Sequence, residues 1–278
     1  MTWHLVSDTA CDLYTLEGGN SQMDFATIPF TIRIGGHEYV DNEQMPIEEM
    51  LEANETHSEM AQTACPSPEE WKKCFSAPGP VIAFTISSAL SGSYNSACAA
   101  RGMVLEEEPD KQIAIIDSKA TGPEEAMLIW RARDLILEGM AFADIEKALN
   151  ETAEKIHTSF ALASYHNLIK AGRVSRLIGF IAGHLGFWGI GIGDEKGEIA
   201  IRGKARGSKS MVRFMTEEIS RVGVAGKQIL ISHCMNEKDA MALKAALEQA
   251  NPGVEVRIQP TRGLDSFYAE RNGLIVGY

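Results

Sequence analysis

The chain has 278 residues, of which 45% are hydrophobic and 23% charged, so its composition is that of an ordinary globular protein of one or two domains. Its 26 basic and 38 acidic residues give a formal net charge of −12, which argues against a general binder of nucleic acid or anionic membranes. The five cysteines form no CxxC pair and indicate reduced thiols in a cytoplasmic protein, not disulfides or a zinc site.

The first half of the sequence repeats one pattern: a short apolar run, a loop rich in Ser, Thr or Asp, and then a helix. The runs are WHLV before SDTACDL, VIAFTI before SSALSGS, and IAII before DSKATG. The pattern predicts βαβ units around a mostly parallel sheet, with helices from Tyr94 to about Glu107 and from Pro123 to about Glu138. Loops at the carboxyl ends of such strands share one sheet edge, where ligands usually bind.

Another helix start is predicted within QTACPSPEEW. Ser67 is suited to the N-cap, Pro68 to the first helical position, and Glu70 to the return bond of a capping box. The preceding residues, 63–66, are therefore expected to form a loop that ends against a helix N-terminus.

The character of the sequence changes near residue 160. An amphipathic helix is predicted for residues 143–157, followed by a strand in FALASY. The next stretch, IKAGRVSRLIGFIAGHL, predicts a loop that leads into a mostly buried helix. A hairpin that turns at DEKG is then predicted in FWGIGIGDEKGEIAIRG. The remaining expected elements are a helix at 207–221, a strand at 228–232, a helix at 237–250, a strand at 254–259 and a last strand in GLIVGY. We therefore expect an α/β protein with two domains, 1–160 and 161–278, and no membrane span, because Gly and His interrupt the longest apolar run.

Hydroxyl side chains are concentrated in the loop TISSALSGSYNSA, residues 85–97. Neutral Ser and Thr donors beside the amides of a helix N-terminus can hold an anion. The candidates are Thr63, Ser88, Ser91 and Ser93. Each could instead cap its own helix or loop, but two such loops at one sheet edge favour a binding site.

Other chemistries have less support. A loop serine acting as the nucleophile of a small-acyl hydrolase or transferase is the alternative function, but the GxSxG turn is missing. Neither GxGxxG nor GxxxxGK[ST] occurs, so no nucleotide cofactor is predicted, and no metal-ligand spacing is found. Asp8 and Asp117 are expected to accept loop hydrogen bonds. The histidines available as a base are scattered: His4, His157, His166, His184 and His233.

Six stretches, in order along nearly the whole chain, resemble motifs of the DegV family. They are LVSDTACDL, TACPSPEEW, ISSALSGSYNSA, IDSKAT, IKAGRVS and DEKGEI. The resemblance implies two α/β domains with a long-chain fatty acid buried between them and its carboxylate near the Thr and Ser loops. It also implies a lipid-binding protein without catalytic residues of its own, since some members present the acid to a separate kinase subunit that makes an acyl phosphate.

The resemblance assigns roles to individual residues. Thr63 matches the leading threonine of the first binding motif, and Ser91 and Gly92 match the Ser-Gly pair of the second, with Ser93 beside them. Arg173 matches the arginine of the family's GGR segment, which lies near the headgroup and the partner surface in kinase-partnered members.

Two further assignments come from the C-terminal half. Arg206 matches an arginine that supports the headgroup after the hairpin, and Arg202 is the competing assignment. Tyr268 stands where the family often has histidine, and its hydroxyl can donate a hydrogen bond without supplying histidine chemistry. Ala64 and Ala171 replace a usual Ser and Gly.

The apolar lining of the lipid site is predicted from LIGFIAGHLGFW and from methionines, with ordinary core packing as the alternative for each residue. The candidates are Leu177, Ile178, Phe180, Ile181, Leu185, Phe187, Trp188, Met127 and Met211.

Overall fold

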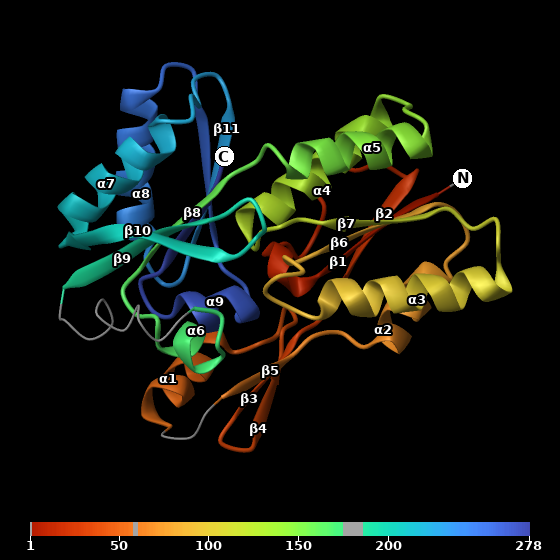
Figure 1. Cartoon of the computed structure of the whole chain (residues 1–278), viewed down its shortest axis with the longest axis horizontal. Helices are drawn as coiled ribbons and strands as arrows, with labels where there is room; N and C mark the ends of the chain where they lie inside the picture. Colours follow the sequence, from red (N-terminus) through yellow and green to blue (C-terminus); the bar gives the residue numbers. More distant parts are fainter. Residues whose placement is uncertain (1, 58–60, 175–185) are drawn as a thin grey trace.

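Three β-sheets organise the computed structural model, which describes residues 2–57, 61–174 and 186–278 (Figure 1). A four-stranded sheet forms the core of the N-terminal half, a six-stranded sheet that of the C-terminal half, and a three-stranded sheet lies in the N-terminal half beside α1. Helices cover the two larger sheets, so the predicted α/β class is confirmed.

The four-stranded sheet is entirely parallel, in the order β2-β1-β6-β7. All five residues of β6 are buried, as expected when helices cover both faces of a parallel sheet. In Figure 1, α4 and α5 lie on one face and α2 and α3 on the other. The elements are β1 (Trp3–Asp8), the short 3-10 helix η1 (Thr9–Cys11), β2 (Met23–Ile28), α2 (Pro68–Phe75), β6 (Val81–Thr85), α3 (Ser93–Glu107), β7 (Ile113–Asp117), α4 (Pro123–Leu137) and α5 (Phe142–Ala153).

The start of α2 follows the predicted capping pattern. The Ser67 hydroxyl accepts a hydrogen bond from the Glu70 amide at 3.3 Å, and a Glu70 carboxylate oxygen accepts one from the Ser67 amide at 2.7 Å. Pro68 occupies the first turn of the helix. These bonds satisfy amides that would otherwise lack partners at the helix N-terminus, which explains why local sequence is enough to place it.

The small antiparallel sheet, in the order β4-β3-β5, is absent from the sequence-based expectation. Its hairpin turns at Gly35 and Gly36, both with positive φ, and Thr63 is paired with Ile32 instead of lying in a loop. A three-residue strand is too short to show alternation, and its pairing depends on residues about 30 positions earlier. The elements are β3 (Thr31–Ile34), β4 (His37–Val40), α1 (Ile47–Thr56) and β5 (Gln62–Ala64).

The six-stranded sheet is mixed, in the order β10-β9-β8-β13-β11-β12, with β11 and β12 parallel and the other neighbours antiparallel. The predicted β9–β10 hairpin and its turn are present, and α7 and α8 cover one face of the sheet. The elements are β8 (Thr158–Leu162), α6 (His166–Lys170), β9 (Phe187–Gly193), β10 (Ile199–Arg206), α7 (Ser208–Ser220), β11 (Gln228–His233), α8 (Glu237–Ala250), β12 (Glu255–Pro260), α9 (Gly263–Ala269) and β13 (Leu274–Gly277).

The two halves meet along α4, which packs against β11 and β13 of the second sheet. The predicted boundary at residue 160 falls inside β8, which pairs with β9 and β13. We therefore propose that the second domain begins just before Thr158. The predicted buried helix and its lipid-lining candidates Leu177, Ile178, Phe180, Ile181 and Leu185 lie outside the described residues.

Candidate functional site

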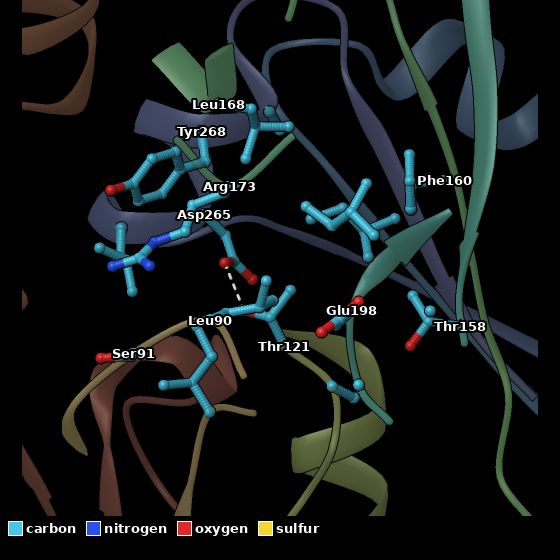
Figure 2. Close-up of a pocket in the computed structure, with 18 of the residues that line it drawn as sticks. Leu90, Ser91, Thr121, Thr158, Phe160, Leu168, Arg173, Glu198, Asp265 and Tyr268 are labelled. Carbon is cyan, nitrogen blue, oxygen red and sulfur yellow. Dashed lines mark hydrogen bonds between the residues drawn. The ribbon is translucent and has the colours of Figure 1, made fainter. Parts of the chain in front are cut away.

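A cavity lies where the two halves meet, at the carboxyl ends of β6 and β7 (Figure 2). It encloses about 1070 Å³ of space free of protein atoms, part of it open to solvent. The loops after β6 and β7 form one wall, and β8, β9, β10 and α9 form much of the other. The larger apolar residues among its described lining are Phe30, Ile86, Leu90, Phe160, Leu162, Leu168, Ile199, Leu264 and Ile275.

Thr63 and Tyr268 meet at the cavity wall although they are 205 positions apart. Their hydroxyl oxygens are 2.8 Å apart, and either can be the donor. Thr63 reaches the cavity from β5 of the small sheet, and Tyr268 from α9. Two of the residues that the sequence analysis assigned to the ligand site are thus hydrogen-bonded to each other.

Ser91 and Gly92 line the same cavity at the start of α3. Gly92 is the N-cap residue, and the Ser91 hydroxyl accepts a hydrogen bond from the Ser93 amide at 3.3 Å. Asp117 fixes the preceding turn, because it accepts hydrogen bonds from the amide and the hydroxyl of Ser88. The amides at a helix N-terminus favour an anion, so this turn is suited to a carboxylate. We call Thr63, Ser91 and Tyr268 the hydroxyl cluster.

Ser93, which was predicted to bind ligand, lies outside the cavity lining. Its side chain is fully buried, and its hydroxyl donates to Asp8 at 2.6 Å. Asp8 also accepts hydrogen bonds from the amides of Ala10 and Ile86, so it ties the loop after β1 to the loop after β6. Asp8 and Asp117 thus accept loop hydrogen bonds, as predicted.

The two predicted arginines lie in different places. Arg173, just after α6, lines the cavity, and its side chain has no carboxylate partner among the described residues (Figure 2). Arg206, at the end of β10, lies outside the cavity with its guanidinium 5.6 Å from the centre of the Phe187 ring. Arg202, the competing assignment, lines a second cavity and lies 3.9 Å from a carboxylate oxygen of Glu218.

Met127, Met211 and Trp188, three of the candidates for the apolar lining, belong to the protein core. Met211 is fully buried under the six-stranded sheet, and Met127 packs on the parallel sheet. Trp188 belongs to the same core as Met211, and neither it nor Phe187 is among the described residues that line the cavity.

Asp265 is a cavity-lining residue that the sequence analysis missed. It is 3% exposed, and one of its carboxyl oxygens accepts a hydrogen bond from the Thr121 hydroxyl at 2.6 Å. A Cβ atom at Gly122 would lie 2.6 Å from the other oxygen of Asp265 and 3.0 Å from a carboxyl oxygen of Asp12. Glycine, with φ of +61° here, therefore lets two carboxyl groups converge on the backbone.

Asp265 belongs to a buried carboxyl cluster, which we define as Asp8, Asp12, Asp41, Glu125 and Asp265. Burial raises the pKa of Asp8 to about 6 and that of Asp12 to about 7. Burial, followed by the neighbouring carboxylates, raises the pKa of Glu125 and Asp265 well above their usual range.

Arg262, which is 2% exposed, is the cation beside the carboxyl cluster. Its Nε lies 3.7 Å from an oxygen of Asp41, and its guanidinium donates to the carbonyls of Leu13 and Asp41. Its backbone amide donates to Asp12 at 2.6 Å. One arginine cannot neutralise five carboxylates, so backbone amides and bound protons also stabilise the cluster.

The missed lining residues Cys65, Thr121, Thr158, Glu198 and Asp265 come from five separate segments. Only Asp265 had a usable signal, because an acidic residue follows an apolar one inside the helical pattern GLDSFYA.

Among the described residues, no group of three His, Cys, Asp or Glu side chains could hold a metal ion. No helix in the described ranges is long and apolar enough to cross a membrane.

The sequence matches the model of a family described as "Uncharacterised protein, DegV family" over residues 2–271. A DegV domain-containing protein of Streptococcus pneumoniae is 36% identical over 278 residues, covering 100% of this chain and 99% of the relative. A homologue from Streptococcus gordonii shows the same identity and coverage.

Solved structures are similar over the same extent. The Streptococcus pneumoniae Fatty Acid Kinase (Fak) B3 protein, loaded with linoleic acid, matches with a TM-score of 0.97 and 36% identity, covering 100% of this chain and 99% of that one. A DegV family protein of Eubacterium eligens, loaded with heptadecanoic acid, matches with a TM-score of 0.95 and 34% identity, covering 99% of both chains.

Proposed function

The chain belongs to the DegV family, and on that premise we propose that it binds a long-chain fatty acid in the cavity between its two halves. The observation that carries the proposal is the form of the cavity, in which a largely apolar wall is combined with the hydroxyl cluster. Fak B3 and the Eubacterium eligens protein, which share its fold at over 30% identity, each hold a fatty acid.

The hydroxyl cluster and the adjoining groups would bind the carboxylate. A buried carboxylate is costly unless several donors bond to it. Tyr268 or Thr63 can turn its hydroxyl hydrogen toward the ligand, and Ser91, the Gly92 amide and Arg173 border the same space. Neutral donors give such a site affinity for an acid without burying a charge when the site holds no acid.

The acyl chain would supply most of the affinity. Burial of each methylene contributes about 0.8 kcal/mol, so the fourteen methylenes of a sixteen-carbon acid contribute roughly 11 kcal/mol before the cost of ordering the chain. The wall formed by Phe160, Leu162 and Ile275 of the six-stranded sheet provides the required apolar surface.

Binding is better supported than hydrolysis by a loop serine. Ser91 accepts a hydrogen bond from the Ser93 amide, and none of the described residues that line the cavity is a histidine. A serine nucleophile needs a base within hydrogen-bond reach, and the described lining offers no suitable imidazole.

We further infer that Arg173 presents the bound acid to a separate kinase subunit. Arg173 borders the cavity, is exposed, and has no carboxylate partner in the described part of the chain. Arg173→Ala is expected to retain the fatty acid but to lose at least tenfold in kinase-dependent formation of acyl phosphate. Arg131→Ala, a change at an exposed arginine of α4, is the matched control and should preserve both activities. Equal phosphorylation by the Arg173 variant and the wild type would contradict this role.

The binding proposal is tested by denaturing extraction of the purified protein followed by mass spectrometry of the lipid fraction. We expect about one long-chain fatty acid per chain, and saturable rebinding of fatty acid after removal of the lipid. A protein without acyl ligand that also fails to bind added fatty acids would contradict the proposal.

A further inference from the structure

The wall of the cavity opposite the hydroxyl cluster carries a hydroxyl of its own. Figure 2 shows Ser91 and Tyr268 on one side of the cavity and Thr158 and Phe160 on the other. Thr158 begins β8, one residue before the Ser159–Ile192 pair of β8 and β9, and it lies next to Gly193. A fatty acid held by its carboxylate at the hydroxyl cluster would therefore bring its chain, not its head, to Thr158.

The Thr158 hydroxyl is buried and unsatisfied. The residue is 7% exposed, and its Oγ1 has no hydrogen-bond partner among the described residues. The neighbouring Gly193 has no side chain to cover it, and a Cβ atom there would lie 3.7 Å from this oxygen. An unpartnered buried hydroxyl is unfavourable, and a purely aliphatic ligand would leave it so.

Other polar groups border the same part of the cavity. Figure 2 shows Glu198 beside Thr158, and the Glu198 side chain belongs to the cavity lining. Glu198 adjoins Ile199, which pairs with Gly193, so Thr158, Gly193 and Ile199 follow one another across three strands. An acyl chain passing here meets a hydroxyl and a carboxylate as well as the apolar side chains of Phe160 and Ile199.

We propose that the preferred ligand is a long-chain fatty acid with a hydroxyl group on its chain, and that Thr158 binds this hydroxyl. This inference rests on the proposed fatty-acid binding and names the ligand class. An alcohol both donates and accepts, so it can accept from Thr158 while donating to Glu198. A keto group can only accept, and its oxygen would gain nothing from the carboxylate of Glu198.

The test compares octadecanoic acid with a panel of its monohydroxy derivatives, substituted at successive chain positions, by competition for the delipidated protein. At least one derivative should bind the wild type about threefold to tenfold more tightly than octadecanoic acid, as expected for one additional hydrogen bond. Thr158→Val, which keeps the side-chain shape, should abolish that preference while still binding octadecanoic acid.

Thr85→Val is the matched control. Thr85 is also a strand threonine with a buried, unpartnered hydroxyl, but it is not among the residues that line the cavity. This variant should keep the preference of the wild type. Gly193→Ala is the second variant, because it retains the Thr158 hydroxyl but places a methyl group beside it, and it should reduce the preference.

The outcomes are distinguishable. Equal binding of all the acids by the wild type, or an unchanged preference in Thr158→Val, would overturn the inference and leave fatty-acid binding intact. Failure of every acid to bind would overturn the proposed function and the inference with it. Loss of the preference in Thr85→Val to the same degree as in Thr158→Val would also overturn the inference, because the effect would not be local to the cavity.

Discussion

The hydroxyl cluster and the carboxyl cluster are both polar regions between the halves of the molecule, but they differ in charge and in exposure to the cavity. The hydroxyl cluster consists of half-buried neutral groups that border a cavity. The carboxyl cluster consists of buried acids, with Arg262 beside them. Neutral hydrogen-bond donors can bind an incoming anion at little cost in free energy. Buried acids, in contrast, are stable only when they are protonated, paired with an arginine or hydrogen-bonded to backbone amides.

Asp265 shows how closely the two regions adjoin, because it lines the cavity and also faces Asp12. Burial, followed by the neighbouring Asp12, raises its pKa and keeps its charge low beside the proposed ligand, while the hydrogen bond from Thr121 acts in the opposite direction. The comparison therefore predicts that changes in the carboxyl cluster alter stability, and that changes in the hydroxyl cluster alter ligand affinity.

The largest expected effect is that of Arg262→Met on stability. The substitution leaves Asp41 with the amides of Gly263 and Leu264 but without its buried cation. Removing one partner of a buried ion pair costs about 3–5 kcal/mol, and urea unfolding of the delipidated protein should show a loss of this order. Arg33→Ala, at an exposed pair with Glu38, is the control and should cost less than about 1 kcal/mol. Equal losses of unfolding free energy in the two variants would contradict the prediction that the buried ion pair contributes more to stability than the exposed one.

The next effect is a dependence of stability on pH. The raised pKa values of Asp8, about 6, and Asp12, about 7, mean that the folded protein holds protons that the unfolded chain releases above about pH 4. This stabilisation is fully present below the unfolded pKa and is lost as the pH rises through the folded pKa. The free energy of unfolding should therefore fall between about pH 4 and pH 7, by up to about 1.4 kcal/mol per pH unit for each retained proton.

Asp12→Asn isolates the contribution of Asp12 to that slope. The asparagine oxygen can still accept from the Arg262 amide, and its NH₂ group can donate toward Asp265 in place of a shared proton. We expect a flatter pH profile in denaturant unfolding, with equal or greater stability at pH 8. If the unfolding free energy of the variant depends on pH as steeply as that of the wild type, the retained protons belong to groups other than Asp12.

A smaller effect is expected at the hydroxyl cluster, and it should appear in affinity. Tyr268→Phe and Thr63→Val each remove one member of a pair 2.8 Å apart, and each should weaken fatty-acid binding by about tenfold, as for the loss of a hydrogen bond to a charged group. The double variant should lose less than the product of the single losses because the two hydroxyls act as a unit. Calorimetric titration measures the three affinities, and full additivity would show that the pair does not act together.

The smallest effect is expected for Arg206→Ala. The guanidinium lies over the Phe187 ring outside the cavity, so the affinity for fatty acid should change by less than twofold. A loss of tenfold or more in the same titration would instead support the headgroup role predicted for Arg206 from the sequence.

Local signals were enough to predict much of the fold. The capping residues around Pro68 and the apolar runs before the Ser- and Asp-rich loops located α2, α3 and α4 and the parallel strands β1, β6 and β7, because these signals act within a few residues. The parallel strand β2 and the helix α1 were not predicted. The small sheet was missed because β5 exists only through its pairing with β3. Thr121, Thr158 and Asp265 were missed at the site for a similar reason, since each becomes notable only when distant segments enclose it.

The most direct test of the central claim is a crystal structure of the complex with a long-chain fatty acid. We expect a carboxylate within hydrogen-bond distance of at least one of Thr63, Ser91 and Tyr268, and an acyl chain that runs past Phe160 toward Thr158. A fatty acid bound outside this cavity, or one with its carboxylate at Thr158 and its methyl end at the hydroxyl cluster, would contradict it.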